Sequence, residues 1–162
     1  KSIDLDKNIT TGEVTKNLAN IGAILMEQIV LSIQKKETIS IVEQRESLVT
    51  YAGKINKSEA RLNMCHAPEV IVRKINSLNP YPGAAIIFRD KILKIWKADV
   101  IKNKDKSIQM SIGELYTYNE ELILKLENGV IKIIELQPEG KTRMDASSFI
   151  RGHEITKIEK IT

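Results

Sequence analysis

The sequence predicts an α+β protein that is mostly β, in which a long amphipathic helix and a polar linker precede a small antiparallel barrel. Two observations carry this prediction. Apolar residues recur every three or four positions over residues 14–33, and they alternate with polar residues in short runs over residues 84–136. A chain of 162 residues, 42% of them hydrophobic, is long enough to bury a core of this kind.

The first predicted element is a helix. Thr10 and Glu13 have the spacing of a capping box, and the apolar residues after them share one helix face. These residues are Val14, Leu18, Ile21, Leu25, Ile29 and Ile33. We expect the stripe to cover a sheet, because a membrane-surface helix would carry more Lys and Arg beside it and some aromatic anchors. No strand run precedes the helix to supply that sheet.

A linker and a second helix follow. Residues 36–57 mix Lys, Glu, Thr, Ser and Gln without an apolar period, which is typical of a linker. A shorter helix is predicted from Pro68 to about Leu78, because proline suits the first turn of a helix. Its predicted apolar face consists of Val70, Ile71, Ile75 and Leu78.

Strands are predicted from Gly83 onward, where the apolar period changes. The predicted strands are residues 84–88, 92–101, 122–126 and 130–136. Short strands at this spacing indicate a small oligonucleotide-barrel-like (OB-like) domain, closed or partly open. Residues 145–151, with Gly152 after them, predict a short capped helix.

The charge is unevenly distributed. Residues 1–50 carry six Lys or Arg and seven Asp or Glu, whereas residues 51–162 carry nineteen and fourteen, so the positive excess of five lies entirely in the second part and the whole chain has a net charge of +4. A basic domain suggests a polyanionic partner, and a merely solvated surface is the alternative. The single cysteine, Cys65, cannot form an internal disulfide, which fits a reducing compartment. No apolar run approaches a membrane span and no leader opens the chain, so we expect neither insertion nor export.

No complete active site is visible in the sequence. Cys65 and His66 are adjacent and His153 is distant, which is not the spacing of a zinc site, and we expect no metal. No glycine-rich phosphate loop occurs. Ser147 and Ser148 lack the glycine context of a nucleophile elbow and are more typical of a helix start.

Two proline- and glycine-bearing stretches are the most specific features of the chain. They are Asn79-Pro80-Tyr81-Pro82-Gly83-Ala84 and Leu136-Gln137-Pro138-Glu139-Gly140-Lys141, the second followed by Met144-Asp145-Ala146. Together with the runs Tyr51 to Arg61, Arg73-Lys74-Ile75, Lys94 to Ala98 and Phe149 to Gly152, they resemble the C-terminal part of methionyl-tRNA formyltransferases in both order and spacing. The family usually has Trp where this chain has Met64 and Tyr81.

The resemblance implies a division of the chain and a function. Residues 1–36 correspond to the last helix of the N-terminal formyltransferase domain, residues 37–60 to a linker, and residues 61–162 to the C-terminal barrel. Members of the family move a formyl group from 10-formyltetrahydrofolate to methionyl initiator tRNA in the cytoplasm. Their catalytic and folate-binding residues lie in the N-terminal domain, and none of those motifs occurs here. The resemblance thus implies a tRNA-binding fragment that holds no catalytic residue or cofactor and is inactive alone.

The candidate tRNA contacts are cations of the linker, the strands and the last turn and helix. They are Lys54, Lys57, Arg61, Lys94, Lys97, Lys125, Lys132, Lys141, Arg143 and Arg151. Lys141 and Arg143 are favoured, because a glycine-bearing turn brings both close together. We expect Trp96 to be a core residue, and Pro80, Pro82 and Gly83 to direct the chain from helix to strand.

Three other functions stay open. A stand-alone nucleic-acid-binding barrel would carry several exposed aromatic residues, and this chain has few. A protein-interaction domain would use the stripe from Val14 to Ile33 to dock on a partner or a second copy, and we expect such self-association in the isolated chain. The third alternative is the C-terminal part of a related sugar formyltransferase or folate hydrolase, since these share the Asn-Pro-x-Pro turn.

Overall fold

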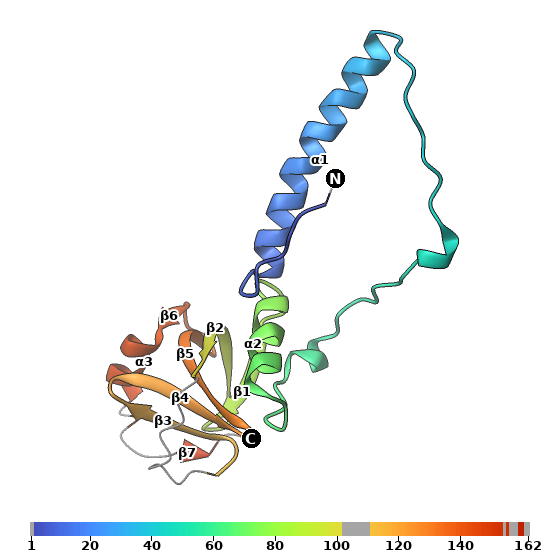
Figure 1. Cartoon of the computed structure of the whole chain (residues 1–162). Helices are drawn as coiled ribbons and strands as arrows, with labels where there is room; N and C mark the ends of the chain where they lie inside the picture. The colour runs from blue at the N-terminus through green and yellow to red at the C-terminus, as the bar shows by residue number, and fades with distance from the viewer. Residues whose placement is uncertain (1, 102–110, 154, 156–158, 161–162) are drawn as a thin grey trace.

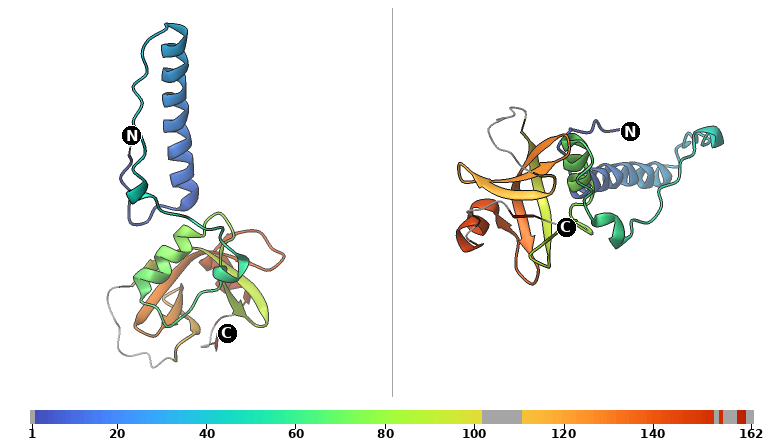
Figure 2. Two further views of the ribbon diagram at one scale, coloured as in Figure 1. Left: turned by 90° about the vertical axis from the view of Figure 1, so that its right-hand side faces the viewer. Right: turned by 90° about the horizontal axis from the view of Figure 1, so that it is seen from below.

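The computed structural model describes residues 2–101, 111–153, 155 and 159–160 of the chain. It has a helical arm, a linker and a small β domain (Figure 1). The arm is helix α1 (Thr11–Gln34), which meets the β domain only at its first turn and points away from it in every view (Figures 1 and 2). The predicted order of helix, linker and β domain is confirmed.

Helix α1 begins as the sequence predicts. The Thr10 hydroxyl accepts a hydrogen bond from the Glu13 amide at 3.3 Å, and the Glu13 carboxylate accepts from the Thr10 amide at 2.8 Å, which completes the capping box. None of its 24 residues is buried. The predicted stripe therefore lies open, and no sheet of the described chain covers it. No helix among the described residues has both the length and the apolar character to span a membrane.

The linker is extended and solvated. Residues 35–59 are all exposed, with single 3-10 turns at η1 (Glu46–Leu48) and η2 (Lys57–Ala60). Burial starts at Ala60, which is 7% exposed. The Leu62 amide then donates to the Ala85 carbonyl at 2.9 Å, so the incoming chain pairs with the edge of the sheet.

One antiparallel sheet forms the β domain, and it curls into a partly open barrel (Figure 1). The strand order is β1-β2-β5-β4-β3-β7, with β6 beside β5. The strands are β1 (Ala84–Phe88), β2 (Lys91–Val100), β3 (Glu114–Tyr118), β4 (Glu121–Leu126), β5 (Gly129–Pro138), β6 (Met144–Asp145) and β7 (Glu159–Lys160). This confirms the predicted α+β class with an OB-like domain.

The four predicted strands are β1, β2, β4 and β5, and three further strands were not predicted. In β3 only Leu115 is buried, which leaves little apolar alternation to detect. Strands β6 and β7 have two residues each, too few for any period.

Two helices flank the barrel core. Helix α2 (Pro68–Ser77) buries Ile71 and Ile75 completely, and helix α3 (Ala146–His153) inserts Phe149, which is 1% exposed. The predicted face of α2 is wrong at one position: Val70 is 38% exposed and Val72 is buried instead. At 100° per residue, Val72 lies closer than Val70 to the centre of the face that Ile71 and Ile75 define.

Helix α3 also differs from its prediction at its end. Gly152 lies inside the helix, which continues to His153, and does not terminate it. The His153 ring stacks on the Phe149 ring with centroids 4.2 Å apart, and its Nδ1 lies 3.0 Å from the Phe149 carbonyl oxygen. These local contacts support the final turn.

Candidate nucleic-acid interface

A β-bulge in strand β2 decides where the strand's polar side chains lie. Ile95 pairs with Leu136 and Lys97 with Glu135, so Trp96 is an extra residue without a partner in β5. Strict alternation from Leu93 and Ile95 would turn Lys97 inward. The bulge instead leaves Lys97 exposed, and both Trp96 and Ala98 are buried.

The Trp96 indole is enclosed, as predicted for a core residue, and is 4% exposed. The turn before β1 lies against it: a Cβ atom on Gly83 would come within 2.5 Å of the ring. Gly83 has a φ of +85°, a conformation that favours glycine. The proline and glycine turn therefore directs the chain, as expected, and also makes room for the indole.

The Gln137 amide connects this indole to the β5–β6 turn. Trp96 Nε1 donates to Gln137 Oε1 at 3.1 Å, and Gln137 Nε2 donates to the Lys141 carbonyl at 2.7 Å. One amide thus uses its acceptor on the strand and its donor on the turn. This gives a physical role to the glutamine of the Leu-Gln-Pro-Glu-Gly-Lys stretch.

Two cations lie against the same ring. Arg143 Cζ is 3.5 Å from the Trp96 ring centroid, and Lys94 Nζ is 5.5 Å from it, both within cation–π range. Lys94 Nζ also donates to the Pro82 carbonyl at 2.9 Å. We call the five residues Lys94, Trp96, Gln137, Lys141 and Arg143 the Trp96 cluster.

The Trp96 cluster is electropositive and half open to solvent. Lys141 and Arg143 are exposed, and Lys94 is half-buried. No carboxylate is ion-paired with these three cations among the described residues. Arg143 stacked on an indole keeps its guanidinium edge free to donate, which is the geometry that binds phosphate oxygens in two-pronged fashion.

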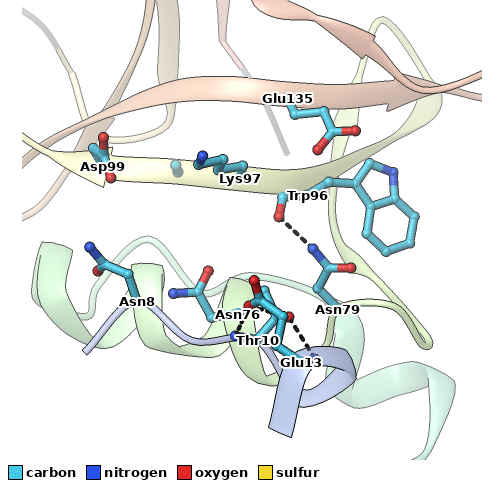
Figure 3. Close-up of a pocket in the computed structure, with 10 residues that line it drawn as sticks. Asn8, Thr10, Glu13, Asn76, Asn79, Trp96, Lys97, Asp99 and Glu135 are labelled. Atoms are coloured by element: carbon cyan, nitrogen blue, oxygen red, sulfur yellow. Dashed lines mark hydrogen bonds between the residues drawn. The ribbon is translucent and has the colours of Figure 1, made fainter. Parts of the chain in front are cut away.

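Lys97 lies in a different setting, although it is on the same strand. It lines a polar pocket of about 320 Å³ between the start of α1, the end of α2 and strand β2 (Figure 3). Glu13, Asp99 and Glu135 line the same pocket. The hydrogen bonds from the Thr10 amide and hydroxyl, and then the charge of Lys97, lower the pKa of Glu13. With three carboxylates around one ammonium, this pocket is less electropositive than the Trp96 cluster.

The other predicted contacts are dispersed. Lys54 and Lys57 lie exposed in the linker, and Arg61 follows at the sheet edge, where its carbonyl accepts from Lys74 Nζ at 2.9 Å. Lys132 is ion-paired with Glu121. Within the described chain, no hydrogen bond, ion pair or ring contact joins these residues to the Trp96 cluster.

The remaining two candidates lie on β4 and α3. Lys125 is half-buried on β4, where it pairs in register with Val130. Arg151 is exposed on α3 and donates to the Ser148 hydroxyl at 3.0 Å. Of the ten predicted cations, the structure thus gathers Lys94, Lys141 and Arg143 in one place.

Ser147 and Ser148 belong to a helix cap. The Asp145 carboxylate accepts from the Ser147 hydroxyl at 2.6 Å and from the Ser148 amide at 2.7 Å. With the Ser148 hydroxyl and the charge of Arg151, these bonds lower the pKa of Asp145 to about 2. Asp145 is therefore an ionised N-cap of α3, and Ser147 and Ser148 donate the hydrogen bonds that it accepts. Across the described residues no three His, Cys, Asp or Glu side chains are grouped to hold a metal ion.

The fold and the Trp96 cluster together define a small OB-like domain with a basic edge and a helical arm. Residues 54–154 match the family model described as formyl transferase, C-terminal domain. The chain belongs to this family. The resemblance drawn from the two proline- and glycine-bearing stretches is thereby confirmed.

Named relatives agree with the family. The chain is 38% identical over 146 residues to the methionyl-tRNA formyltransferase of Dictyoglomus turgidum, covering 89% of this chain and 46% of that protein. It is 36% identical to the enzyme of the same name from Dictyoglomus thermophilum, covering 96% and 50%. The chain thus spans about half the length of these relatives.

Solved structures share the fold at low sequence identity. The crystal structure of a HypX variant from Aquifex aeolicus matches 99% of this chain and 28% of its own, with a TM-score of 0.72 and 12% identity. HypX from the same organism in complex with tetrahydrofolic acid matches 100% of this chain and 30% of its own, with a TM-score of 0.71 and 12% identity. The arm, linker and β domain therefore recur together in a distant protein.

Proposed function

We propose that this chain is the tRNA-binding C-terminal portion of a methionyl-tRNA formyltransferase, which transfers a formyl group from 10-formyltetrahydrofolate to methionyl initiator tRNA in translation initiation. The Trp96 cluster is the observation that carries the proposal, because it places three cations without carboxylate partners on one edge of an OB-like domain. The relatives are named methionyl-tRNA formyltransferases, and we take methionyl-tRNA as the proposed nucleic acid from that name. The cytoplasm is the corresponding location.

The proposed mechanism of this part is electrostatic and geometric. Arg143 and Lys141 neutralise neighbouring phosphates of the tRNA backbone, and each contact releases a condensed counterion. The Gln137 amide holds the Trp96 indole, and the indole orients the Arg143 guanidinium that stacks on it. Contacts of this kind set position and carry no sequence information, so base reading belongs elsewhere in the longer protein.

The predicted cations divide into three groups by their surroundings. Lys94, Lys141 and Arg143 form the primary contact in this proposal. Lys54, Lys57 and Arg61 extend the same role into the linker, where side chains are exposed. Lys97, Lys125, Lys132 and Arg151 contribute least, because Lys97 and Lys132 lie by carboxylates, Lys125 is half-buried on β4 outside the Trp96 cluster, and Arg151 supports a cap.

The open stripe of α1 fits the proposed division of the chain at residues 1–36, 37–60 and 61–162. We propose that the stripe packs against the formyl-transferring domain of the longer protein, which holds the catalytic residues and the folate co-substrate. The 24-residue helix with no buried residue supports this. The chain alone is then inactive in formyl transfer.

A second candidate function rests on the same stripe. In the isolated chain the exposed residues of α1 form an apolar surface that a second copy can cover, so association of the chain with itself is the alternative role for this helix. It predicts dimers and gives no reason for the Trp96 cluster.

Fluorescence anisotropy with labelled initiator tRNA tests the proposal. The affinity is expected to fall linearly on a log–log plot as the salt concentration rises from about 50 to 200 mM, with a slope of roughly −0.9 per phosphate contact. A binding constant that does not change over this range, or no detectable binding, would contradict a phosphate-holding role.

A further inference from the structure

Helix α1 meets the β domain through one small joint. The Gly12 amide donates to the Asn79 carbonyl at 3.0 Å, and the Thr11 hydroxyl donates to the Ser77 carbonyl at 2.7 Å. The first amides of a helix and the last carbonyls of a helix lack partners in their own helices. Here the start of α1 satisfies carbonyls at the end of α2.

Gly12 is held close to the turn that follows α2. A Cβ atom at Gly12 would lie 2.9 Å from Pro80 Cδ and 3.7 Å from the Asn79 oxygen. Gly22, farther along the same helix, has nothing within 4 Å of such an atom. Glycine lowers helix stability, so the requirement for it at Gly12 comes from this close approach.

Asn79 extends the joint to the Trp96 cluster. Its backbone oxygen accepts from Gly12, while its side-chain Nδ2 donates to the Trp96 carbonyl at 3.0 Å (Figure 3). That carbonyl belongs to the bulged residue whose indole lies under Arg143. A continuous set of contacts thus runs from the first turn of α1 to the basic edge of the barrel.

Beyond these bonds, the described chain gives the helix the charge interaction of Glu13 with Lys97 across the polar pocket, and no buried surface along its length. No residue of α1 is buried, and the linker that returns to the barrel is exposed throughout residues 35–59 (Figures 1 and 2). Loss of the joint would leave α1 free to swing about residues 8–12.

We propose that Gly12 and Asn79 are positioning residues, and that their joint holds helix α1 in one direction relative to the Trp96 cluster. The geometric part stands on the contacts alone. The consequence for tRNA rests on the proposed function: a helix docked on the formyl-transferring domain would carry that domain at a set angle to the bound tRNA. The joint would then determine the position of the tRNA end relative to the formyl-transferring domain.

Pulsed electron–electron resonance on the whole chain tests the joint without tRNA. Spin labels are placed at Gln34 and Lys91, both exposed, in a Cys65→Ser background and diluted with unlabelled chain. Wild type is expected to give one narrow distance peak, and Gly12→Ala a peak at least twice as wide. Gly22→Ala is the matched control and should retain the wild-type width.

A second pair of variants covers the case that Gly12→Ala disturbs folding. Thr11→Val removes the hydroxyl that bonds to Ser77 and is expected to widen the peak, whereas Thr11→Ser restores that hydroxyl and the narrow peak. Equal peak widths in wild type, Gly12→Ala and Thr11→Val would overturn the proposed role of the joint.

The tRNA consequence is measured separately, with one label at Gln34 and one on the 5′ end of initiator tRNA. Gly12→Ala should keep the tRNA affinity within about twofold and widen the protein-to-tRNA distance distribution, because binding lies in the cluster and direction in the joint. An unchanged distribution would overturn the positioning role. Failure of wild type to bind tRNA would reject the proposed function and leave the geometric result intact.

Discussion

Helices α1 and α2 show the same apolar periodicity, but only α2 buries its apolar face. Helix α2 has ten residues and buries Ile71 and Ile75 completely against the barrel. Helix α1 has 24 residues and buries none. The periodicity of a sequence therefore identifies the apolar face of a helix, but it does not identify what covers that face.

The two helices are also stabilised differently. The shorter helix α2 depends on tertiary burial, because ten residues are too few for an isolated helix in water. Helix α1 is long and closes its first turn with a capping box, so local interactions maintain it. Mutations should consequently act on the fold through α2 and on association through α1.

The largest expected effect separates the two helices by stability. Ile75→Ala should lower the free energy of unfolding by about 2–5 kcal/mol, because it removes a fully buried side chain, whereas Ile29→Ala, at 43% exposure, should change it by less than about 0.5 kcal/mol. Urea denaturation followed by fluorescence of Trp96, the single tryptophan, measures both. Equal losses would show that the face of α1 is buried in solution.

A smaller effect is expected within the β domain, at the Gln137 amide. Gln137→Leu leaves the buried indole N–H of Trp96 without an acceptor and should cost about 1–3 kcal/mol. Gln137→Glu keeps that acceptor but places a carboxylate oxygen, in place of the amide donor, against the Lys141 carbonyl, so it should loosen the turn while sparing the indole bond. Urea denaturation of the two variants distinguishes them, and an equal cost would remove the role assigned to the indole bond.

The stripe of α1 should govern association of the isolated chain. Size-exclusion chromatography with light scattering is expected to show a species larger than the monomer, and Ile29→Lys with Ile33→Lys should weaken association at least about tenfold, as two charges enter an apolar contact. Ile41→Lys, at an exposed linker position, is the matched control. A clean monomer for the wild-type chain would refute the self-association expected from the sequence.

The smallest effect concerns the acidic cap of α3. The pKa of Asp145 is lowered to about 2 from an ordinary value of 3.8, so its contribution to stability is complete above about pH 4 and is lost as the pH falls through 2. Asp145→Asn keeps a cap acceptor that does not titrate. Melting temperatures from pH 5 to 2 should therefore fall a few degrees less in this variant, and parallel curves would contradict the assignment.

The local signals in the sequence predict most of the fold. The capping box of α1, the Pro68 start of α2 and the four predicted strands β1, β2, β4 and β5 all appear, because each depends on residues close together in the chain. Strand β3 escapes prediction because it buries only Leu115, and strands β6 and β7 escape because two residues in register with a distant partner have no period of their own.

The candidate site is harder to predict than the fold. Burial of Trp96 follows from its place in an apolar strand, and Lys141 and Arg143 follow from the turn. The stacking of Arg143 on Trp96 and the separation of Lys94 from Lys97 do not, because they depend on the bulge between β2 and β5. The stacking and the separation are therefore both determined by how β2 pairs with β5, a strand distant in the sequence.

The most direct test of the proposed function compares the effect of removing two cations from the Trp96 cluster with the effect of removing two from the far end of α1. Lys141→Ala with Arg143→Ala removes two cations from the Trp96 cluster, and Lys35→Ala with Lys36→Ala removes two exposed cations at the far end of α1. In anisotropy titrations with initiator tRNA, the cluster variant should weaken binding and reduce the magnitude of the salt slope by about two, and the arm variant should match wild type. Equal losses in both variants would show that net charge alone attracts the tRNA and that the Trp96 cluster is no binding site.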